Sequence, residues 1–243
     1  MVSKSQIKLI TSLQQKKYRE KEGLFIAEGP KVISELREAG LKLHSLYSSE
    51  IDQVDSKSIF SVTETELQKI SSLKTANKSL AIFEIPKQSI TPSEGVIVAL
   101  DAIRDPGNLG TIIRLCDWFG VTQLVCSKDT ADCYNPKVIQ ATMGSIARVD
   151  VQYLDLVSYL SNPQLPVYGG VLDGTSIYAS EMPSEAIIVM GNEANGVSEE
   201  IAKTFTHTIT IPQFGIAQKT ESLNVATATA IMLSEFRRRT TER

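Results

Sequence analysis

The sequence contains few of the residues on which metal-dependent and histidine-based enzymes rely. Among 243 residues there are only two histidines, three cysteines and one tryptophan. Cys116, Cys126 and Cys133 lack the paired spacing of a zinc site, and we expect them to be free thiols in the core. His44 and His207 fall in predicted strands, and we expect both to be structural. The sequence therefore predicts neither a bound metal nor histidine-based catalysis.

Long apolar segments and several familiar enzyme motifs are also missing. No uninterrupted apolar run reaches the ~18 residues of a membrane-spanning helix, and the N-terminal MVSKSQIKLITS lacks the apolar segment of a signal peptide. Together with unpaired cysteines, these absences favour a cytoplasmic protein without a membrane partner. The phosphate-loop pattern G-x-x-x-x-G-K-S/T, a G-x-G-x-x-G turn after a strand and the G-x-S-x-G elbow do not occur, which disfavours three common enzyme classes.

Charge is distributed unevenly along the chain. The formal net charge is −3, yet residues 1–90 contain 14 Lys and Arg against 11 Asp and Glu. Within this part a short basic segment contains Lys16, Lys17, Arg19 and Lys21. Such a segment can follow an RNA phosphate backbone even in an acidic protein. A solvated helix face explains the same charges equally well, so charge permits RNA binding without demanding it.

The first part of the chain is expected to form a small α/β domain over residues 1–88. Periodicity predicts strands at 24–27, 43–47 and 80–85, and helices at 5–15, 30–39 and 67–73. Thr63 and Glu66 form a capping-box pattern ahead of the last of these helices. Residues 89–95 belong to a stretch rich in proline and serine, which predicts a linker.

From residue 96 to residue 243 predicted strands and helices alternate, which indicates a parallel sheet covered on both faces. Strands are expected at 96–100, 122–126, 149–153, 167–171, 187–190 and 207–211, and helices at 109–119, 135–143, 155–160, 199–204 and 222–238. Asn135 and Pro136 are a typical helix start. The final helix is apolar on most sides, so it must pack on its own sheet or on a partner subunit.

Two strand-to-loop junctions contain polar and glycine residues from which a site could be built. In DAIRDPGNLGTIIR (101–114) we expect Asn108 to cap a helix that carries Arg114 about two turns further on. The plain alternative is an ordinary cap and a surface ion-pair partner. In IIVMGNEANGVS (187–198), Gly191 and Gly196 suggest close backbone approach, and Glu193 follows the strand end. The alternative here is a glycine-rich turn with a solvated acid.

A third junction, IPQFGIAQKTESLNVATATA (211–230), resembles the other two in its layout. The chain leaves a strand at Pro212, passes Gly215 and reopens as a helix for which Ser222 is the expected N-cap. A helix N-terminus after a glycine-containing loop presents backbone N–H groups to a ligand. All three junctions follow the carboxyl ends of predicted parallel strands, where open α/β sheets bind ligands. We therefore expect them to converge on one crevice.

These three motifs, in this order, resemble the SpoU (TrmH-like) branch of the SPOUT RNA methyltransferases. NPKVIQATMGSIARV (135–149) is similar to the family's intervening segment, and GLFIAEGPKVISEL (23–36) to the small α/β RNA substrate-binding domain ahead of many members. The resemblance implies a C-terminal parallel-sheet SPOUT domain tied in a deep trefoil knot, a rare feature. It also implies a homodimer formed through that domain, S-adenosyl-L-methionine as cofactor, and methyl transfer to a ribose 2′-OH in ribosomal or transfer RNA.

The resemblance also assigns roles to individual residues. It places the cofactor against Leu172, Gly191, Asn192, Glu193, Gly196, Ile211, Pro212, Ser222, Leu223 and Asn224. It places Asn108, Arg114, Glu193, Ser222 and Asn224 in the catalytic constellation. The resemblance and the charge of the basic segment together predict that RNA is contacted by Lys16, Lys17, Arg19, Lys21 and Arg114.

The resemblance implies that Arg114 activates the ribose hydroxyl, but a guanidinium is too weakly acidic to serve well as a base at neutral pH. Holding the flanking phosphate and stabilising developing oxyanion charge is physically easier. Because Arg114 lies well along its helix, its ligand is expected to belong to the partner chain. Ala226 replaces a serine found in many members, and the loop 213–221 is longer and less basic than usual. Two alternatives are an RNA-binding module of the same fold without catalysis and a nucleotide-binding α/β protein of another class.

Overall fold

The computed structural model describes residues 2–51, 57–87, 95–215 and 221–238. The chain forms two compact units. The first consists of Met1–Lys87 together with Asp132–Ala147, and the second of Gln88–Ala131 together with Arg148–Arg243. The described residues leave out 88–94, and therefore most of the predicted linker at 89–95. The segment 132–147 thus belongs to the first unit, although the chain reaches it only after two strands of the second.

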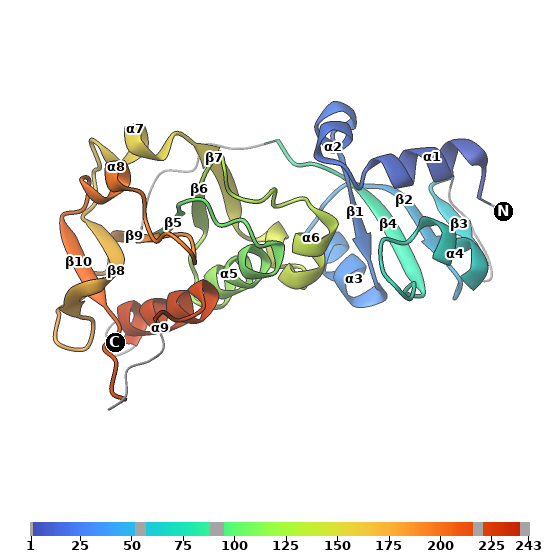
Figure 1. Ribbon diagram of the computed structural model, residues 1–243. Coiled ribbons are helices and arrows are strands. Elements are labelled where there is room, and N and C mark those ends of the chain that lie inside the picture. Colours follow the sequence, from blue (N-terminus) through green and yellow to red (C-terminus); the bar gives the residue numbers. More distant parts are fainter. Residues whose placement is uncertain (1, 52–56, 88–94, 216–220, 239–243) are drawn as a thin grey trace. The chain divides into compact units, whose positions relative to one another are not determined.

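The first unit is built on a four-stranded sheet with the order β1-β4-β2-β3 (Figure 1). Its strands are β1 (Leu24–Glu28), β2 (Leu43–Ser48), β3 (Ile59–Ser61) and β4 (Ser79–Glu84). Strands β1 and β2 pair antiparallel with β4, whereas β3 pairs parallel with β2. Sequence periodicity predicted the other three strands but missed β3, which has only three residues.

The helices of the first unit begin at well-defined caps. They are α1 (Lys4–Ser12), α2 (Lys16–Glu22), α3 (Pro30–Glu38), α4 (Glu64–Ile70), α6 (Pro136–Thr142) and the 3-10 turn η1 (Ser145–Ala147). The predicted capping box of Thr63 and Glu66 is confirmed at α4, and α1 has a second one at Ser3. Helices α1 and α4 contribute Ile10, Leu67 and other side chains to an apolar cluster on one face of the sheet.

Helix α6 and the residues around it are fastened to the first unit by tight packing. The Asn135 side chain caps α6 by accepting from the Lys137 N–H at 2.9 Å, as the sequence predicted. The rings of Tyr134 and Phe25 lie 5.0 Å apart. At Gly144 (φ +99°) an added Cβ would come within 2.5 Å of the Cβ of Glu35, so only glycine fits without a shift.

The second unit contains a six-stranded, all-parallel sheet with the order β10-β8-β9-β5-β6-β7, which confirms the predicted parallel sheet. Its strands are β5 (Val96–Leu100), β6 (Gln123–Ser127), β7 (Asp150–Leu154), β8 (Val167–Ser176), β9 (Ala186–Met190) and β10 (His207–Thr210). Strand β8 is twice as long as β9, at ten residues against five, and its pairing with β10 shifts register after Thr208.

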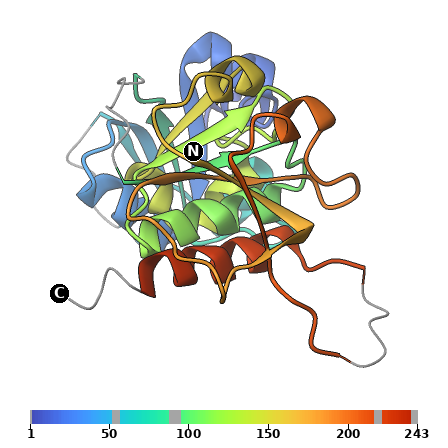
Figure 2. The ribbon, with the colours of Figure 1, turned by 90° about the vertical axis from the view of Figure 1, so that its left-hand side faces the viewer.

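Helices cover both faces of this sheet. Helices α5 (Pro106–Trp118) and α9 (Val225–Arg238) lie side by side on one face, and α7 (Leu156–Leu160) and α8 (Glu199–Ala202) on the other (Figures 1 and 2). Burial raises the pKa of the Cys116 thiol on α5 to about 12, so this cysteine stays protonated in the core. All three cysteines are buried thiols outside any disulfide, as predicted.

The chain itself covers the apolar side of α9, which answers one question that the sequence left open. Val225, Met232 and Phe236 are buried, and α9 packs along α5. The guanidinium of Arg237 donates to the backbone oxygens of Phe119 and Gly120, at 2.8 and 2.9 Å, where α5 ends. A cation at this position satisfies carbonyls that have no partner within the helix.

Among the described helices, none has the length and apolar character needed to cross a membrane. The trefoil knot depends on the path of the chain between β10 and α9. Residues 216–220 of that path lie outside the described residues, so the knot stays a prediction.

Candidate active site

The carboxyl ends of the central strands of the second unit are tied together by hydrogen bonds. After β5, the Asp101 N–H donates to the Met190 carbonyl at the end of β9, at 2.9 Å. The Asp101 carboxylate, which is 7% exposed, accepts from the Ser198 N–H at 2.8 Å. The Asn192 amide donates to the Ala102 carbonyl at 2.8 Å. These contacts hold the loop after β5 against the loop after β9.

Helix α5 starts earlier than predicted, and this changes the role of Asn108. The N-cap is Asp105, whose carboxylate accepts from the Asn108 N–H at 2.8 Å, with Pro106 in the first turn. The prediction that Asn108 caps the helix is therefore wrong. An acid followed by proline and glycine is an efficient helix start. Because Asp105 caps the helix, the Asn108 side chain is available for other contacts.

The Asn108 side chain joins the three motifs singled out in the sequence. Its Nδ2 donates to the Glu193 carboxylate, and its Oδ1 accepts from Asn224 Nδ2 at 2.9 Å. Because a carboxylate only accepts and an asparagine amide has one donor and one acceptor end, this chain of contacts has a single consistent direction. The predicted convergence of the three junctions is confirmed. Asn108 and Asn224 are 116 residues apart in the sequence.

Asn224, rather than Ser222, caps the last helix. Its Oδ1 accepts from the backbone N–H groups of Ala226 and Thr227, at 3.0 and 3.2 Å, and α9 begins at Val225. The predicted N-cap at Ser222 is therefore wrong, because a better cap lies two residues further on. The two ends of the Asn224 amide have different partners: the oxygen caps α9, and the nitrogen donates to Asn108. Ser222 is exposed ahead of the helix.

The glycine loop after β9 is closed on itself. Asn192 and Gly196 exchange both backbone hydrogen bonds, at 2.9 and 2.8 Å. A Cβ on Gly191 would lie 2.3 Å from the backbone of Gly196 and Val197, and Gly196 has a left-handed φ of +67°. Both glycines are therefore required by the loop itself. Its closure turns Glu193, which is exposed, toward Asn108.

Arg114 lies on the exposed side of α5. Within the described part of the chain no hydrogen bond or ion pair joins it to Asn108, Glu193 or Asn224. Ala102, by contrast, sits close to the site in a left-handed conformation (φ 54°) that costs a non-glycine residue energy. Its N–H donates to Ser127 Oγ at 2.8 Å and its carbonyl accepts from Asn192, so two side chains hold it in place.

Large apolar side chains are exposed at the same edge of the sheet. Leu172 is 70% exposed and Leu223 is 46% exposed, and Ile211 and Pro212 are partly exposed. The Thr210 hydroxyl donates to the Leu172 carbonyl at 2.9 Å, which ties β8 to the end of β10. Apolar groups next to free strand ends suit a flat aromatic ligand with polar edge atoms. These apolar side chains fit the adenosyl group of S-adenosyl-L-methionine.

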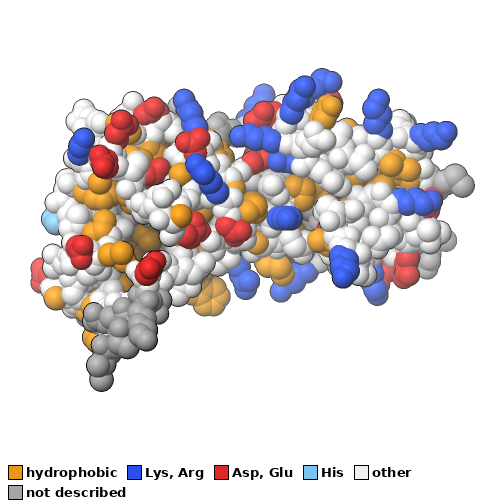
Figure 3. All heavy atoms as spheres, in the orientation of Figure 1, with side chains coloured by type: hydrophobic (Ala, Val, Ile, Leu, Met, Phe, Trp, Pro, Cys, Tyr) orange, Lys and Arg blue, Asp and Glu red, His pale blue; other side chains and the backbone are white. Residues whose placement is uncertain are grey.

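The basic segment at α2 is partly different from the prediction. Lys16, Lys17 and Lys21 are exposed, and Lys and Arg side chains stand out over this part of the chain (Figure 3). Arg19, however, is only 2% exposed. Its guanidinium pairs with the Asp132 carboxylate and donates to the Leu13 carbonyl at 2.8 Å. Arg19 as a contact to RNA phosphate is therefore wrong, because its donors are already used inside the protein.

The structural roles of Asp101, Asp105 and Asp132 were not predicted from the sequence. A signal was present for Asp105, because it directly precedes the Pro-Gly pair that opens α5. Asp101 directly follows a buried strand, yet nothing in the sequence links it to Ser198. Arg19, the partner of Asp132, lies 113 residues away in the sequence, so no local pattern reveals the pair.

Open parallel α/β sheets bind ligands at this edge, and the polar cluster and exposed apolar side chains found there are typical of a cofactor site. The pattern of the SpoU rRNA Methylase family matches residues 95–234, and the chain is a member of that family. The MRM3-like substrate binding domain matches residues 4–81.

Known relatives resemble the whole chain. A Bacillus subtilis protein named 23S rRNA (guanosine(2553)-2′-O)-methyltransferase is 30% identical over 234 residues, which cover 93% of each chain. A solved structure from Porphyromonas gingivalis, assigned to the TrmH family of RNA methyltransferases, is 38% identical with a TM-score of 0.88 and covers 98% of this chain and 99% of that one. An AdoMet-bound rRNA methyltransferase from Sinorhizobium meliloti is 30% identical with a TM-score of 0.86, covering 98% and 97%.

Proposed function

We propose that this protein is an S-adenosyl-L-methionine-dependent RNA methyltransferase that transfers a methyl group to a ribose 2′-OH. The observation that carries the proposal is the contact chain Glu193–Asn108–Asn224, which unites three family motifs at one edge of the sheet. The named activity of the Bacillus subtilis relative and the cofactor of the Sinorhizobium meliloti structure support it. The RNA is ribosomal or transfer RNA.

The cofactor site lies at the ends of β8, β9 and β10. Leu172, Ile211, Pro212 and Leu223 supply apolar surface for the adenosyl group, and the loop of Gly191, Asn192, Glu193 and Gly196 supplies backbone polar groups. Ser222 adds a hydroxyl ahead of α9. When bound, S-adenosyl-L-methionine supplies a sulfonium-activated methyl group.

The residues of the contact chain then prepare the ribose for reaction. Asn108 fixes the Glu193 carboxylate through a charge-assisted hydrogen bond, so that this group keeps a defined orientation at the site. Asn224 fixes Asn108 in turn. A carboxylate held in this way can orient the 2′-OH and accept its proton as the oxygen attacks.

Arg114 acts as an electrostatic clamp rather than as a base. A guanidinium stays protonated at neutral pH and offers a fork of N–H donors to a phosphate or to developing oxyanion charge. Arg114 is exposed, and α5 also carries Trp118, which is 83% exposed. Both features fit a homodimer in which α5 lies at the interface and Arg114 serves the RNA bound to the partner subunit. Cysteines that remain thiols outside disulfides suit a cytoplasmic enzyme.

Isothermal titration with S-adenosylhomocysteine tests the cofactor site directly. The unchanged protein should bind it, and Leu172→Glu should weaken binding at least about tenfold, because a charge would replace apolar contact surface. Tyr178→Glu is the matched control, since Tyr178 is also an exposed apolar residue, at 48%, and has no place in the proposed site. No detectable heat with the unchanged protein would count against the proposed function itself.

A further inference from the structure

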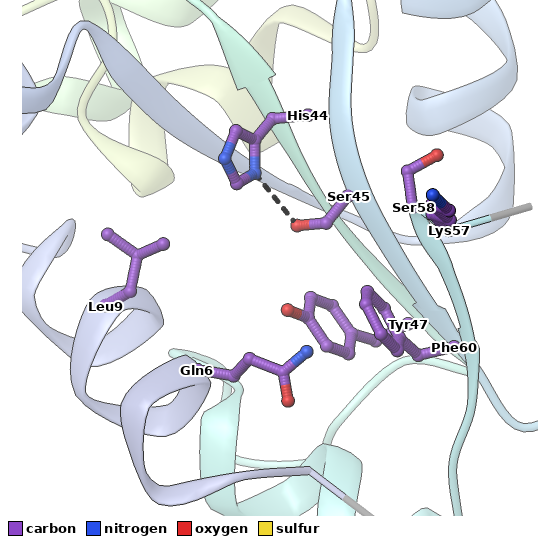
Figure 4. Close-up of a pocket in the computed structure, with 8 residues that line it drawn as sticks. All are labelled: Gln6, Leu9, His44, Ser45, Tyr47, Lys57, Ser58 and Phe60. Atoms are coloured by element: carbon purple, nitrogen blue, oxygen red, sulfur yellow. Dashed lines mark hydrogen bonds between the residues drawn. The ribbon is translucent and has the colours of Figure 1, made fainter.

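A pocket in the first unit lies outside the site described above. It is a cavity of about 290 Å³ lined by Gln6, Leu9, His44, Ser45, Tyr47, Lys57, Ser58 and Phe60. Figure 4 shows side chains of α1 on one side of an open space and side chains of β2 on the other. The volume is at the lower limit for small-molecule sites, which suits one flat ring system better than a large ligand.

The walls of the pocket combine an aromatic pair with an apolar side chain. The rings of Tyr47 and Phe60 are stacked, with centroids 5.0 Å apart and planes inclined by 15°. Leu9 faces this region from α1 (Figure 4). Tyr47 is 2% exposed and therefore rigid, whereas Phe60 and Leu9 are partly exposed. A planar ligand would meet surfaces that are already formed.

Besides Lys57, the pocket is lined by polar side chains that form hydrogen bonds. His44 Nδ1 lies 3.3 Å from Ser45 Oγ, and the phenol of Tyr47 interacts with the side chains of Ser45 and Gln6. Burial raises the pKa of Tyr47, so its hydroxyl remains a donor. His44, to which the sequence analysis gave a purely structural role, is exposed at this opening. Together these groups offer both donors and acceptors to the edge of a ring.

Cations lie near the pocket without dominating it. Among the described residues that line the pocket, Lys57 is the one cation, and Lys4 and Lys8 are exposed on α1 on either side of Gln6. A site built for a free phosphate would gather several N–H or guanidinium donors. Here the Lys57 ammonium group lies beside a pocket lined by aromatic rings and the Gln6 amide. This combination suits a nucleobase with one adjoining phosphate.

We propose that this pocket binds one unstacked nucleobase of the RNA substrate. This inference rests on the proposed function, because it takes the ligand to be RNA. Unpaired bases are recognised by packing against aromatic and apolar side chains while their edges make hydrogen bonds. The pocket supplies both kinds of contact, and Lys57 is placed to meet the phosphate that accompanies the base. The first unit would thus select RNA with an exposed base rather than a regular helix.

Photo-crosslinking locates the base. Oligouridine containing 4-thiouridine is irradiated with the full-length protein, and crosslinked peptides are mapped by mass spectrometry. The inference predicts crosslinks within the peptides that contain His44 to Phe60. Crosslinks found only in peptides outside the pocket would overturn it.

A matched set of variants measures the contribution of the pocket. Combining His44→Ala with Phe60→Leu should lower the affinity for single-stranded RNA about tenfold, equivalent to ~1.4 kcal/mol. Lys31→Ala on α3 is the control and should leave the affinity unchanged, because Lys31 is exposed but does not line the pocket. Thermal melting verifies that the double variant is folded; if it is not, His44→Ala alone replaces it, because His44 is exposed. An equal affinity of variant and unchanged protein would overturn the inference.

Failure of the pocket can be distinguished from failure of the proposed function. S-adenosylhomocysteine binding should be the same in the pocket variants and the unchanged protein. If the unchanged protein binds S-adenosylhomocysteine and methylates RNA while crosslinks avoid the pocket, only the inference fails. If RNA does not bind to the unchanged protein at all, both fail.

Discussion

At the scale of single residues, the site depends on two asparagines whose amide ends have separate tasks. Asn224 caps α9 with its oxygen and reaches Asn108 with its nitrogen, and Asn108 passes this constraint to Glu193. Neither amide can be reversed without losing a contact. Asn108→Asp or Asn224→Asp would replace the donor nitrogen with an oxygen and add a negative charge. The carboxylate of Glu193 is thereby placed before any substrate arrives, which reduces the cost of ordering it.

The clamp assigned to Arg114 can be tested because its removal should have little effect on folding. Arg114 is exposed, so Arg114→Ala should change the free energy of unfolding by no more than about 0.5 kcal/mol. Turnover should fall about a hundredfold or more, while S-adenosylhomocysteine affinity stays unchanged. Arg114→Lys should recover only part of the rate, because an ammonium lacks the guanidinium fork. Equal losses of turnover and cofactor affinity would instead indicate a structural role.

At the scale of elements, α2 contains exposed lysines and a buried arginine whose difference in exposure cannot be read from the sequence. Its lysines are exposed, but its arginine fastens the helix to Asp132 and to the Leu13 carbonyl. Removal of one member of such a buried pair leaves an uncompensated charge, at a typical cost of about 3–5 kcal/mol. The same helix therefore has an exposed basic surface, where we propose RNA contacts, and an internal anchor.

Two variants of α2 should consequently have different effects. Changing Lys16, Lys17 and Lys21 together to Glu should weaken RNA binding and lower the slope of log affinity against log salt by about 0.7–0.9 for each lost phosphate contact. Arg19→Met should mainly lower stability in urea denaturation. Filter binding at several salt concentrations, run beside the denaturation curves, distinguishes the two. An unchanged salt slope in the lysine variant would place the RNA on another surface.

The elements predicted from the sequence were those with strong local signals. Hydrophobic runs located the parallel strands, and Thr63 and Asn135 located their helix starts, because capping is a contact between near neighbours. Caps were misplaced where two candidates stood close together, as with Asp105 and Asn108. The convergence of the three junctions could be predicted from the rule that the carboxyl ends of parallel strands meet at one edge. The burial of Arg19 could not be predicted, because its partner lies far along the chain.

At the scale of the whole molecule, one unit contains the proposed catalytic site and the other has features suited to RNA binding. The second unit brings together Asn108, Glu193 and Asn224, with exposed apolar side chains at the proposed cofactor site. The first has exposed lysines on α2 and the pocket at His44 and Tyr47. Methyl transfer to a ribose needs both, since the 2′-OH is present at every nucleotide and selection must come from contacts elsewhere on the RNA.

The most direct test of the account is to identify the methylated atom. Purified protein is incubated with isotopically labelled S-adenosyl-L-methionine and ribosomal or transfer RNA from cells that lack the protein, and digested nucleosides are analysed by mass spectrometry. The account predicts label in a 2′-O-methylnucleoside with the unchanged protein, and a greatly reduced amount with Arg114→Ala. Label on a base, or RNA binding without any labelled nucleoside, would contradict it.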